Sequence, residues 1–347
     1  MPCASCRWLL PVIEIDKIAP LSGVQDAGRW PWRAQGVPGS GPLDDWSMAV
    51  SNVLVGNAPD TAALEIGFGY SRLRFRKPAV IALCGARCKA RIDEAVAPLW
   101  RPLWIAAGSE LSLSPGRLGH RCYLAVAGGL ATPEVLGSRS AVSAGGQFPG
   151  MLERGARLPL ASSQPEPWAV LTQRLSGAHA QAAPWWADGE PILDMEGQAT
   201  LRIIEGAHAH LLHQRRALYT QPFRLSPASN RMAARLDGPA LEIGHAGSLV
   251  SEPVVPGTIQ LPPDGGPLVL LAEAQTIGGY PRIGHLAGVD LARLAQRRPG
   301  SELRFEPISV ALAQRLWIWR RERLVRMQIA VRARLGEVNL PAAGAAG

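Results

Sequence analysis

The sequence predicts a mainly β protein with an internal duplication and a few short helices. Glycine and proline supply 37 and 30 of the 347 residues, so turns must be frequent and most elements short. A Pro-spacer-Ser segment around Ser40 returns 189 positions later around Ser229. Two further pairs of similar segments follow in the same order. Residues 63–65 resemble residues 250–252 at an offset of 187, and residues 108–111 resemble residues 300–303 at an offset of 192. Echoes at nearly constant offset indicate a duplicated module.

The length of the chain allows two domains, each with its own core. We expect a first module with extra strands and a linker over residues 10–195. The second module is expected over residues 200–310, and a basic C-terminal helix or tail over residues 311–347.

The first module is expected to begin with a strand over residues 12–15, followed by a polar loop and a helix. Ser40 is the predicted N-cap, with Pro42 in the first turn and Asp44 at the positive end of the helix dipole, and Gly56 ends the helix. A glycine-rich loop that enters a helix in this way can bind an anion or a carbonyl oxygen. A well-capped core helix is the alternative interpretation.

Alternating and apolar runs predict the remaining elements of both modules. In the first module they predict strands over residues 63–83 broken near Gly67 and Gly69, a hairpin-like pair around Gly108, a strand over 121–126, and a linker over 161–200. In the second they predict strands over residues 201–204, 258–261, 268–272 and 302–305, and a helix over 286–297. The polar residues 273–282 follow a buried strand, which is where binding sites are usually built.

The charge is concentrated at the C-terminus. The net charge is +8, but residues 312–347 hold seven arginines against two glutamates, so the body is nearly neutral and nucleic-acid binding by it is not expected. Five cysteines, an odd number, favour a reducing compartment. No signal peptide or membrane span is visible, so we expect a soluble cytoplasmic protein.

Two short motifs resemble metal sites but have simpler explanations. Cys3-x-x-Cys6 has no second pair, and His208-x-His210-x-x-His213 has no accompanying carboxylate, so we predict no metal site. Phosphate-loop, serine-elbow, S-x-x-K and biotin-attachment motifs are not found in the sequence. Polar loops and arginines without a complete catalytic set favour one component of a complex over a self-contained enzyme.

Several motifs together resemble the biotin-dependent carboxyltransferase family, also called allophanate hydrolase subunit 2 or KipA, which includes the C subunit of bacterial 5-oxoprolinase. They are Gln25-Asp26-x-Gly28-Arg29, Gly36-Val37-Pro38-x-Ser40-Gly41-Pro42-x-Asp44, Leu54-Val55-Gly56-Asn57, Leu64-Glu65, Tyr123-Leu124-Ala125-Val126-Ala127-Gly128-Gly129, Leu136-Gly137-Ser138-Arg139-Ser140 and Gln275-Thr276-x-Gly278-Gly279-Tyr280-Pro281. They lie in the family's order between residues 12 and 305.

The resemblance implies two cyclophilin-like β-barrel modules whose polar loops face a common cleft. It implies ATP-dependent opening of a cyclic amide, 5-oxo-L-proline, to L-glutamate, with a subunit-B (KipI-like) protein and a subunit-A protein as partners. The ATP site is either shared with a partner or located on it, and no biotin is expected on this chain. Two alternatives remain open: a carboxyltransferase component of a biotin-dependent urea or amide carboxylase, and a KipA-type regulatory binding protein without turnover.

The resemblance also suggests roles for the polar residues of these loops. Arg29, Arg139 and Arg231 are predicted to hold carboxylate or phosphate oxygens, because the guanidinium fork suits both. Gln275 and Tyr280 would orient the amide. Further predicted site residues are Asp44 and Glu65 in a catalytic or positioning role, and Gln25, Asp26, Ser40, Ser229, Gly278 and Gly279 in binding.

Overall fold

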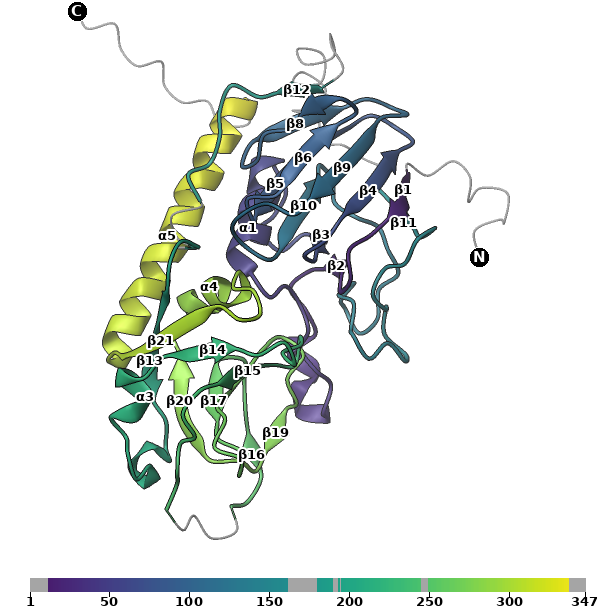
Figure 1. Cartoon of the computed structure of the whole chain (residues 1–347). Coiled ribbons are helices and arrows are strands. Elements are labelled where there is room, and N and C mark those ends of the chain that lie inside the picture. Colours follow the sequence, from purple (N-terminus) through teal and green to yellow (C-terminus); the bar gives the residue numbers. More distant parts are fainter. Residues whose placement is uncertain (1–11, 162–179, 190–192, 194, 245–248, 337–347) are drawn as a thin grey trace, which may run out of the picture.

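The protein consists of a two-sheet module, a barrel module and a long C-terminal helix that lies along both (Figure 1). The structure is a computed structural model, and it describes residues 12–161, 180–189, 193, 195–244 and 249–336. The mainly β class predicted from the sequence is confirmed.

The first sheet of the first module has six antiparallel strands. Their order is β11 (Arg157–Pro159), β1 (Val12–Lys17), β4 (Ser71–Phe75), β9 (Glu110–Ser114), β6 (Lys89–Ile92) and β7 (Ala95–Val96). Its inward side chains alternate with exposed ones, as in β4, where Leu73 and Phe75 are buried and Arg72 is exposed.

The second sheet also has six strands, and it is covered on both faces. The order is β12 (Ala180–Ala182), β8 (Pro102–Ile105), β5 (Ala79–Gly85), β10 (Cys122–Val126), β3 (Ala63–Ile66) and β2 (Gly23–Gln25). One face packs on the first sheet, and helix α1 (Asp45–Leu54) packs on the other through Val50 and Val53. Burial on both faces explains why β5 and β10 are continuous apolar runs.

The second module closes into a seven-stranded barrel, whereas the strands of the first are divided between two sheets. The barrel order is β13 (Ala199–Glu205), β20 (Arg282–Leu286), β17 (Thr258–Gln260), β18 (Leu268–Leu270), β15 (Ala233–Asp237), β14 (Phe223–Leu225) and β21 (Glu302–Pro307). Outside the barrel, β16 (Glu252–Pro253) pairs with β19 (Ile277–Gly278).

Short helical segments connect these elements. They are η2 (Trp30–Gln35), η4 (Ala209–Leu211), α3 (Ala217–Thr220), η5 (Gly288–Asp290) and α4 (Leu291–Ala295). The helix predicted over residues 286–297 is therefore shorter and begins as a 3₁₀ turn.

Helix α5 (Val310–Leu335) has 26 residues and lies in the segment where a basic C-terminal helix or tail was expected, in addition to the short helices of the two modules. Ser309 caps its N-terminus by accepting the Leu312 amide, and Gly336 ends it in the left-handed conformation, with φ 80°. Val331 and Leu324 pack in the same apolar cluster as α1.

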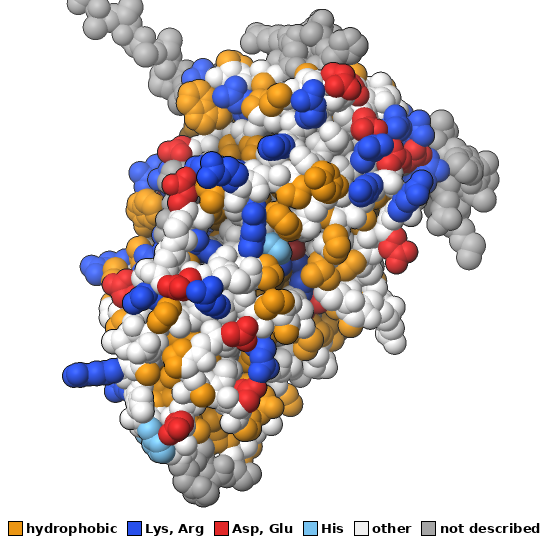
Figure 2. All heavy atoms as spheres, in the orientation of Figure 1, with side chains coloured by type: hydrophobic (Ala, Val, Ile, Leu, Met, Phe, Trp, Pro, Cys, Tyr) orange, Lys and Arg blue, Asp and Glu red, His pale blue; other side chains and the backbone are white. Residues whose placement is uncertain are grey.

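On the face shown in Figure 2, basic and acidic side chains are interspersed and form no large single-sign patch.

The predicted start of the first helix was wrong. Ser40 adopts a left-handed φ of 59°, and the helix begins at Asp45 with Asp44 as its N-cap. Asp44 caps by accepting the Ser47 amide at 2.9 Å, whereas the Ser40 hydroxyl donates to the Ala141 carbonyl oxygen. The helix ends just before Gly56, as predicted.

Two other local predictions were wrong. The segment around Gly108 is not a hairpin, because β8 and β9 belong to different sheets and the glycine turn carries the chain from one to the other. The echo of the first helix at Ser229 is a turn between strands β14 and β15. The sequence repeat of residues 108–111 and 300–303 does correspond to similar local structure. Gly108 and Gly300 both have positive φ, 87° and 83°, and each precedes a strand.

The predicted linker over residues 161–200 is only partly described. Residues 180–182 in it form β12, which pairs with β8 at the edge of the second sheet, and residues 162–179 lie outside the described part of the chain.

Candidate functional site

A buried network of charged side chains joins the two modules, with Glu65 at its centre. Glu65 lies on β3 with an exposed fraction of 1%. Its carboxylate accepts the Tyr123 hydroxyl at 2.7 Å and the Leu43 amide at 2.9 Å. Because Tyr123 also accepts the Asp44 amide at 2.8 Å, the segment before α1 is fixed to the sheet.

Arg231 of the barrel module completes this network from the other side. Its guanidinium donates to the carboxylates of Glu65 and Glu273 and to the Gly41 carbonyl oxygen, and only 1% of the residue is exposed. Glu273 also accepts the Ser143 amide at 3.0 Å. One guanidinium therefore ties the loop before β15 to two segments of the first module.

Gln296 makes a second connection between the modules. Its amide nitrogen donates to Asp44 at 2.6 Å, and its oxygen accepts the amides of His120 and Arg121 at 2.9 and 3.0 Å. Asp44 is completely buried, and loss of solvation raises its pKa to about 6 in spite of hydrogen bonds from Gln296 and Ser47.

Asp26 organises the loop at the entrance of the junction. It accepts the amides of Gly28 at 3.0 Å and Arg139 at 2.6 Å and the hydroxyls of Ser138 and Ser140. Burial acts to raise the pKa of Asp26, but the hydrogen bonds outweigh it and the pKa is lowered, so the group is a carboxylate at neutral pH.

The other predicted residues of this loop donate to carbonyl oxygens of residues 135–141, a segment far away in the sequence. Arg29 is buried, donates to the carbonyl oxygens of Val135 and Ser138 at 3.0 and 3.1 Å, and lies over the Phe148 ring. Gln25 donates to Ala141 at 3.3 Å, as Ser40 does at 2.8 Å. The Ser40 amide donates to the Ala272 carbonyl oxygen at 2.9 Å, which brings the loop against the barrel module.

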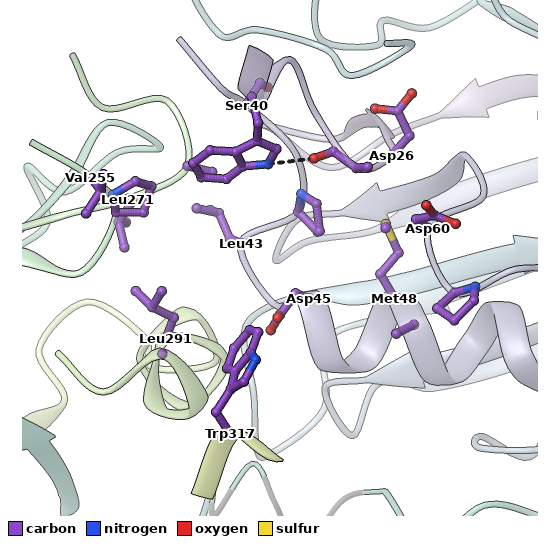
Figure 3. A pocket seen from close by; sticks show the side chains of 18 residues that line it. Asp26, Ser40, Leu43, Asp45, Met48, Asp60, Val255, Leu271, Leu291 and Trp317 are labelled. Atoms are coloured by element: carbon purple, nitrogen blue, oxygen red, sulfur yellow. Dashed lines mark hydrogen bonds between the residues drawn. The ribbon is translucent and has the colours of Figure 1, made fainter. Parts of the chain in front are cut away.

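A cleft of about 520 Å³ opens between the modules next to this loop (Figure 3). Its walls are largely apolar and include two partly exposed indoles, those of Trp30 and of Trp317 on α5. The lining residues are Asp26, Ala27, Trp30, Ser40, Pro42, Leu43, Asp45, Met48, Ala49, Pro59, Asp60, Val255, Pro256, Leu271, Ala272, Gly288, Leu291 and Trp317. They include three carboxylates and no arginine or lysine.

The Gln275 loop of the barrel lies beside the cleft rather than in its lining. The Gln275 side chain donates to Gln260 at 3.2 Å, and its carbonyl oxygen accepts Arg33 of the first module at 3.3 Å. Gly278 and Gly279 follow at the β16–β19 ribbon, and Tyr280 is 46% exposed. Polar loops of both modules thus meet at the junction.

The structure sorts the predicted site residues into groups. Asp26 and Ser40 line the cleft, and Asp44, Glu65 and Arg231 form the sealed junction. Gln25 ends β2 and Gly278 ends β19, whereas the remaining predicted residues lie in loops. Ser229 accepts the Arg235 amide at 3.0 Å in its turn, and Arg139 donates to Thr132. The assigned roles in catalysis and anion binding stay predictions.

Sequence reasoning missed three cleft residues, Trp30, Asp45 and Trp317. Trp317 was passed over because its basic segment was taken as a surface helix. Asp45 was not predicted as a site residue, although it pairs with Arg320 of α5 at 2.6 Å. The aromatic residues among the arginines of α5 were a signal that one face of this helix packs on the body.

Neither a metal-binding cluster nor a membrane-spanning helix is found among the described residues. Among these residues, no three His, Cys, Asp or Glu side chains come together as a metal site would require. Cys3 and Cys6 lie outside the described part of the chain. No described helix is both long and apolar enough to span a bilayer.

Comparisons with known proteins place the fold in a family. The chain is 35% identical over 305 residues to the C subunit of 5-oxoprolinase from Escherichia coli, covering 86% of this chain and 92% of the relative. It is 29% identical over 311 residues to the corresponding C subunit from Haemophilus influenzae, covering 88% and 94%. The crystal structure of Kluyveromyces lactis urea carboxylase is similar, with a TM-score of 0.78 and 25% sequence identity. The match covers 92% of this chain and 29% of that longer protein. The family model of the carboxyltransferase domain, subdomain A and B, matches residues 35–307, and this chain belongs to that family.

Proposed function

We propose that this protein is the C subunit of a bacterial 5-oxoprolinase, which opens 5-oxo-L-proline to L-glutamate at the expense of ATP together with the A and B subunits. The observation that carries the proposal is the 35% identity to a 5-oxoprolinase C subunit over nearly the full length of both chains. The cleft between the modules supports it, because such a concave, mostly apolar site with a few polar groups suits a small cyclic amide.

The chemistry explains why ATP is needed. The lactam of 5-oxoproline is a resonance-stabilised amide whose carbonyl carbon resists attack by water. Transfer of the γ-phosphoryl group of ATP to this oxygen, with release of ADP, makes the carbon electrophilic. Water adds to that carbon, the C–N bond breaks to free the amine and leave an acyl phosphate, and a second water releases phosphate to give glutamate.

The charges of the cleft favour an ATP site on a partner or shared with one. Asp26, Asp45 and Asp60 line it, and although Asp45 pairs with Arg320 of α5, the lining itself contains no lysine or arginine, so it disfavours a triphosphate. The sequence also lacks a phosphate loop. In this proposal the cleft holds the lactam ring against its apolar wall, and the Asp26 loop and Ser40 orient the ring's polar edge.

The test is reconstitution. The chain is purified with the A and B subunits, and glutamate formed from 5-oxoproline and ATP is measured with and without it. Ala49→Trp fills the cleft from the exposed side of α1 and should reduce the rate at least tenfold, whereas Ala311→Trp, on an exposed position of α5 outside the cleft, should leave it unchanged. Full activity of the Ala49→Trp complex would remove the cleft from the reaction.

A second candidate function is carboxyl transfer in a biotin-dependent urea or amide carboxylase. The match of 92% of this chain to the Kluyveromyces lactis urea carboxylase structure favours it. In that case carboxybiotin supplied by another polypeptide or domain would be consumed, and no glutamate would form from 5-oxoproline. An intact complex with neither activity would instead support a regulatory binding protein.

A further inference from the structure

Two cysteines of the first module lie in direct contact on the side of the sheet away from the cleft. Cys122 is the first residue of β10 and is buried, and Cys88, half-buried, lies just before β6. Their sulfur atoms are 3.6 Å apart, within the range of a hydrogen bond between the two thiols. The contact joins positions 34 residues apart in the chain.

The pair borders a small hollow in the surface. The hollow has a volume of about 20 Å³ and is lined by both cysteines together with His120, Arg298 and the turn residues Gly116 and Gly119. A volume of roughly 10–15 Å³ is enough for one water molecule. A molecule of the size of hydrogen peroxide therefore fits beside the two sulfur atoms.

The two thiols are in different environments. The interaction with Cys122 lowers the pKa of Cys88, whereas the same interaction and burial raise the pKa of Cys122 well above its ordinary value. Cys88 is thus both the more exposed and the more readily ionised of the two, as a peroxide-reactive cysteine requires. Cys84, the third described cysteine, is completely buried in β5 and its pKa is raised well above normal by burial.

We propose that Cys88 and Cys122 form a reversible disulfide when the folded protein meets hydrogen peroxide. The Cys88 thiolate attacks one peroxide oxygen, the O–O bond breaks, and Cys88 becomes a sulfenic acid as hydroxide leaves and takes up a proton. The sulfur of Cys122 then attacks the sulfur of Cys88, the S–O bond breaks, and a second water leaves. Two thiols and one peroxide give one disulfide and two waters, and an added dithiol reduces the disulfide back to two thiols while it becomes a disulfide itself.

The position of the pair links this disulfide to the module junction. Cys122 is flanked in β10 by Tyr123, which donates to Glu65, and by Arg121, whose amide donates to Gln296. The cross-link would fix the end of the strand from which both junction contacts start.

Peptide mapping tests the proposal directly. Trypsin releases Cys88 in residues 88–89, Cys122 in residues 122–139 and Cys84 in residues 77–87, so the three thiols separate. After treatment of the folded protein with hydrogen peroxide and alkylation, the expected product is peptide 88–89 bound to peptide 122–139, lighter than their sum by two hydrogen atoms. Dithiothreitol should remove it.

Variants identify the order of events. In Cys122→Ser, Cys88 should accumulate as a sulfenic acid that dimedone traps, and in Cys88→Ser, the peptide of residues 122–139 should stay reduced. Cys84→Ser is the matched control and should form the link as the parent protein does. Irreversible oxidation of Cys88 without a link to Cys122, or a link that requires Cys84, would overturn the proposal. Because the readout is a covalent bond, its outcome is independent of the enzymatic activity.

Discussion

The sealed junction and the open cleft lie next to each other, yet their charged groups are arranged in opposite ways. In the junction, Arg231 forms ion pairs with Glu65 and Glu273, and each of the three residues is at most 3% exposed. In the cleft, carboxylates such as Asp45 remain partly exposed, with 45% of its side chain in contact with solvent. The comparison indicates that the junction sets the relative position of the modules, whereas the cleft leaves polar groups accessible to a ligand.

The largest expected effect is in the sealed junction. Arg231→Ala leaves Glu273 buried without its counter-charge and Glu65 with only the more distant Arg121 at 3.7 Å, which should cost about 3–5 kcal/mol of unfolding free energy. Arg215→Ala breaks an ion pair whose two side chains are 50% and 41% exposed, and it should cost at most about 1 kcal/mol. Chemical denaturation measures both.

This experiment also examines the anion-binding role predicted for Arg231. If Arg231→Ala is as stable as the parent protein but the reconstituted complex loses turnover, Arg231 acts on substrate and the structural interpretation of the junction is wrong.

The second prediction concerns the dependence of stability on pH. Burial raises the pKa of Asp44 from 3.8 to about 6 in the folded protein. The folded state therefore binds this proton more tightly than the unfolded state, so the contribution is fully present below pH 4 and is lost as the pH rises through 6. A shift of this size corresponds to about 3 kcal/mol.

The difference between wild type and Asp44→Asn isolates this group from the other titrating groups. Wild type should gain stability relative to the variant as the pH falls from above 6 to below 4, when unfolding free energies are measured across the window. Asparagine must place its amide nitrogen against either the amide nitrogen of Gln296 or the backbone amide of Ser47, and both are donors, so the variant should be less stable at every pH. A difference that does not change with pH would show that Asp44 titrates normally.

The third prediction compares two glycines of the loop region next to the cleft. Gly28 and Gly36 have nearly equal positive φ values, 84° and 82°, but a Cβ on Gly28 would lie 2.6 Å from the Gly39 carbonyl oxygen, whereas one on Gly36 would meet nothing within 4 Å. Gly36→Ala should cost roughly 1 kcal/mol for the conformation alone, and Gly28→Ala should cost roughly 2 because the loop must also move.

The two variants also separate stability from function. If the Asp26 loop positions a ligand in the cleft, Gly28→Ala should raise the KM of the reconstituted complex for 5-oxoproline and Gly36→Ala should not. Equal effects of the two substitutions would indicate that the shape of the loop is not important for binding.

The sequence was sufficient for many of the strands but not for the partners of the polar side chains. Strands β5 and β10 are continuous apolar runs that any periodicity analysis finds, and the glycine turns before β9 and β21 mark their starts. Arg231 was predicted to bind an external anion because its carboxylate partner Glu65 is 166 residues away, a separation at which no local rule applies. Ser40 was predicted as a helix cap because the Ala141 carbonyl oxygen that it binds lies 101 residues further along the chain.

The smallest predicted effect is at the contact of α5 with the rim of the cleft. Arg320 is nearly buried, donates to both oxygens of Asp45 at 3.0 and 2.6 Å and lies 4.6 Å from the ring centre of Trp317, but Asp45 itself is half exposed. Arg320→Ala should therefore cost only about 1 kcal/mol, while Arg326→Ala, which loses one exposed pair with Glu322 on the same helix, should cost at most about 0.5.

Fluorescence of Trp317 would follow the local change, measured against a Trp317→Phe background to remove the signal of the other tryptophans. Because Asp45 and Trp317 both line the cleft, release of this helix should alter ligand binding more than global stability, and a change in stability without a change in binding would separate α5 from the site.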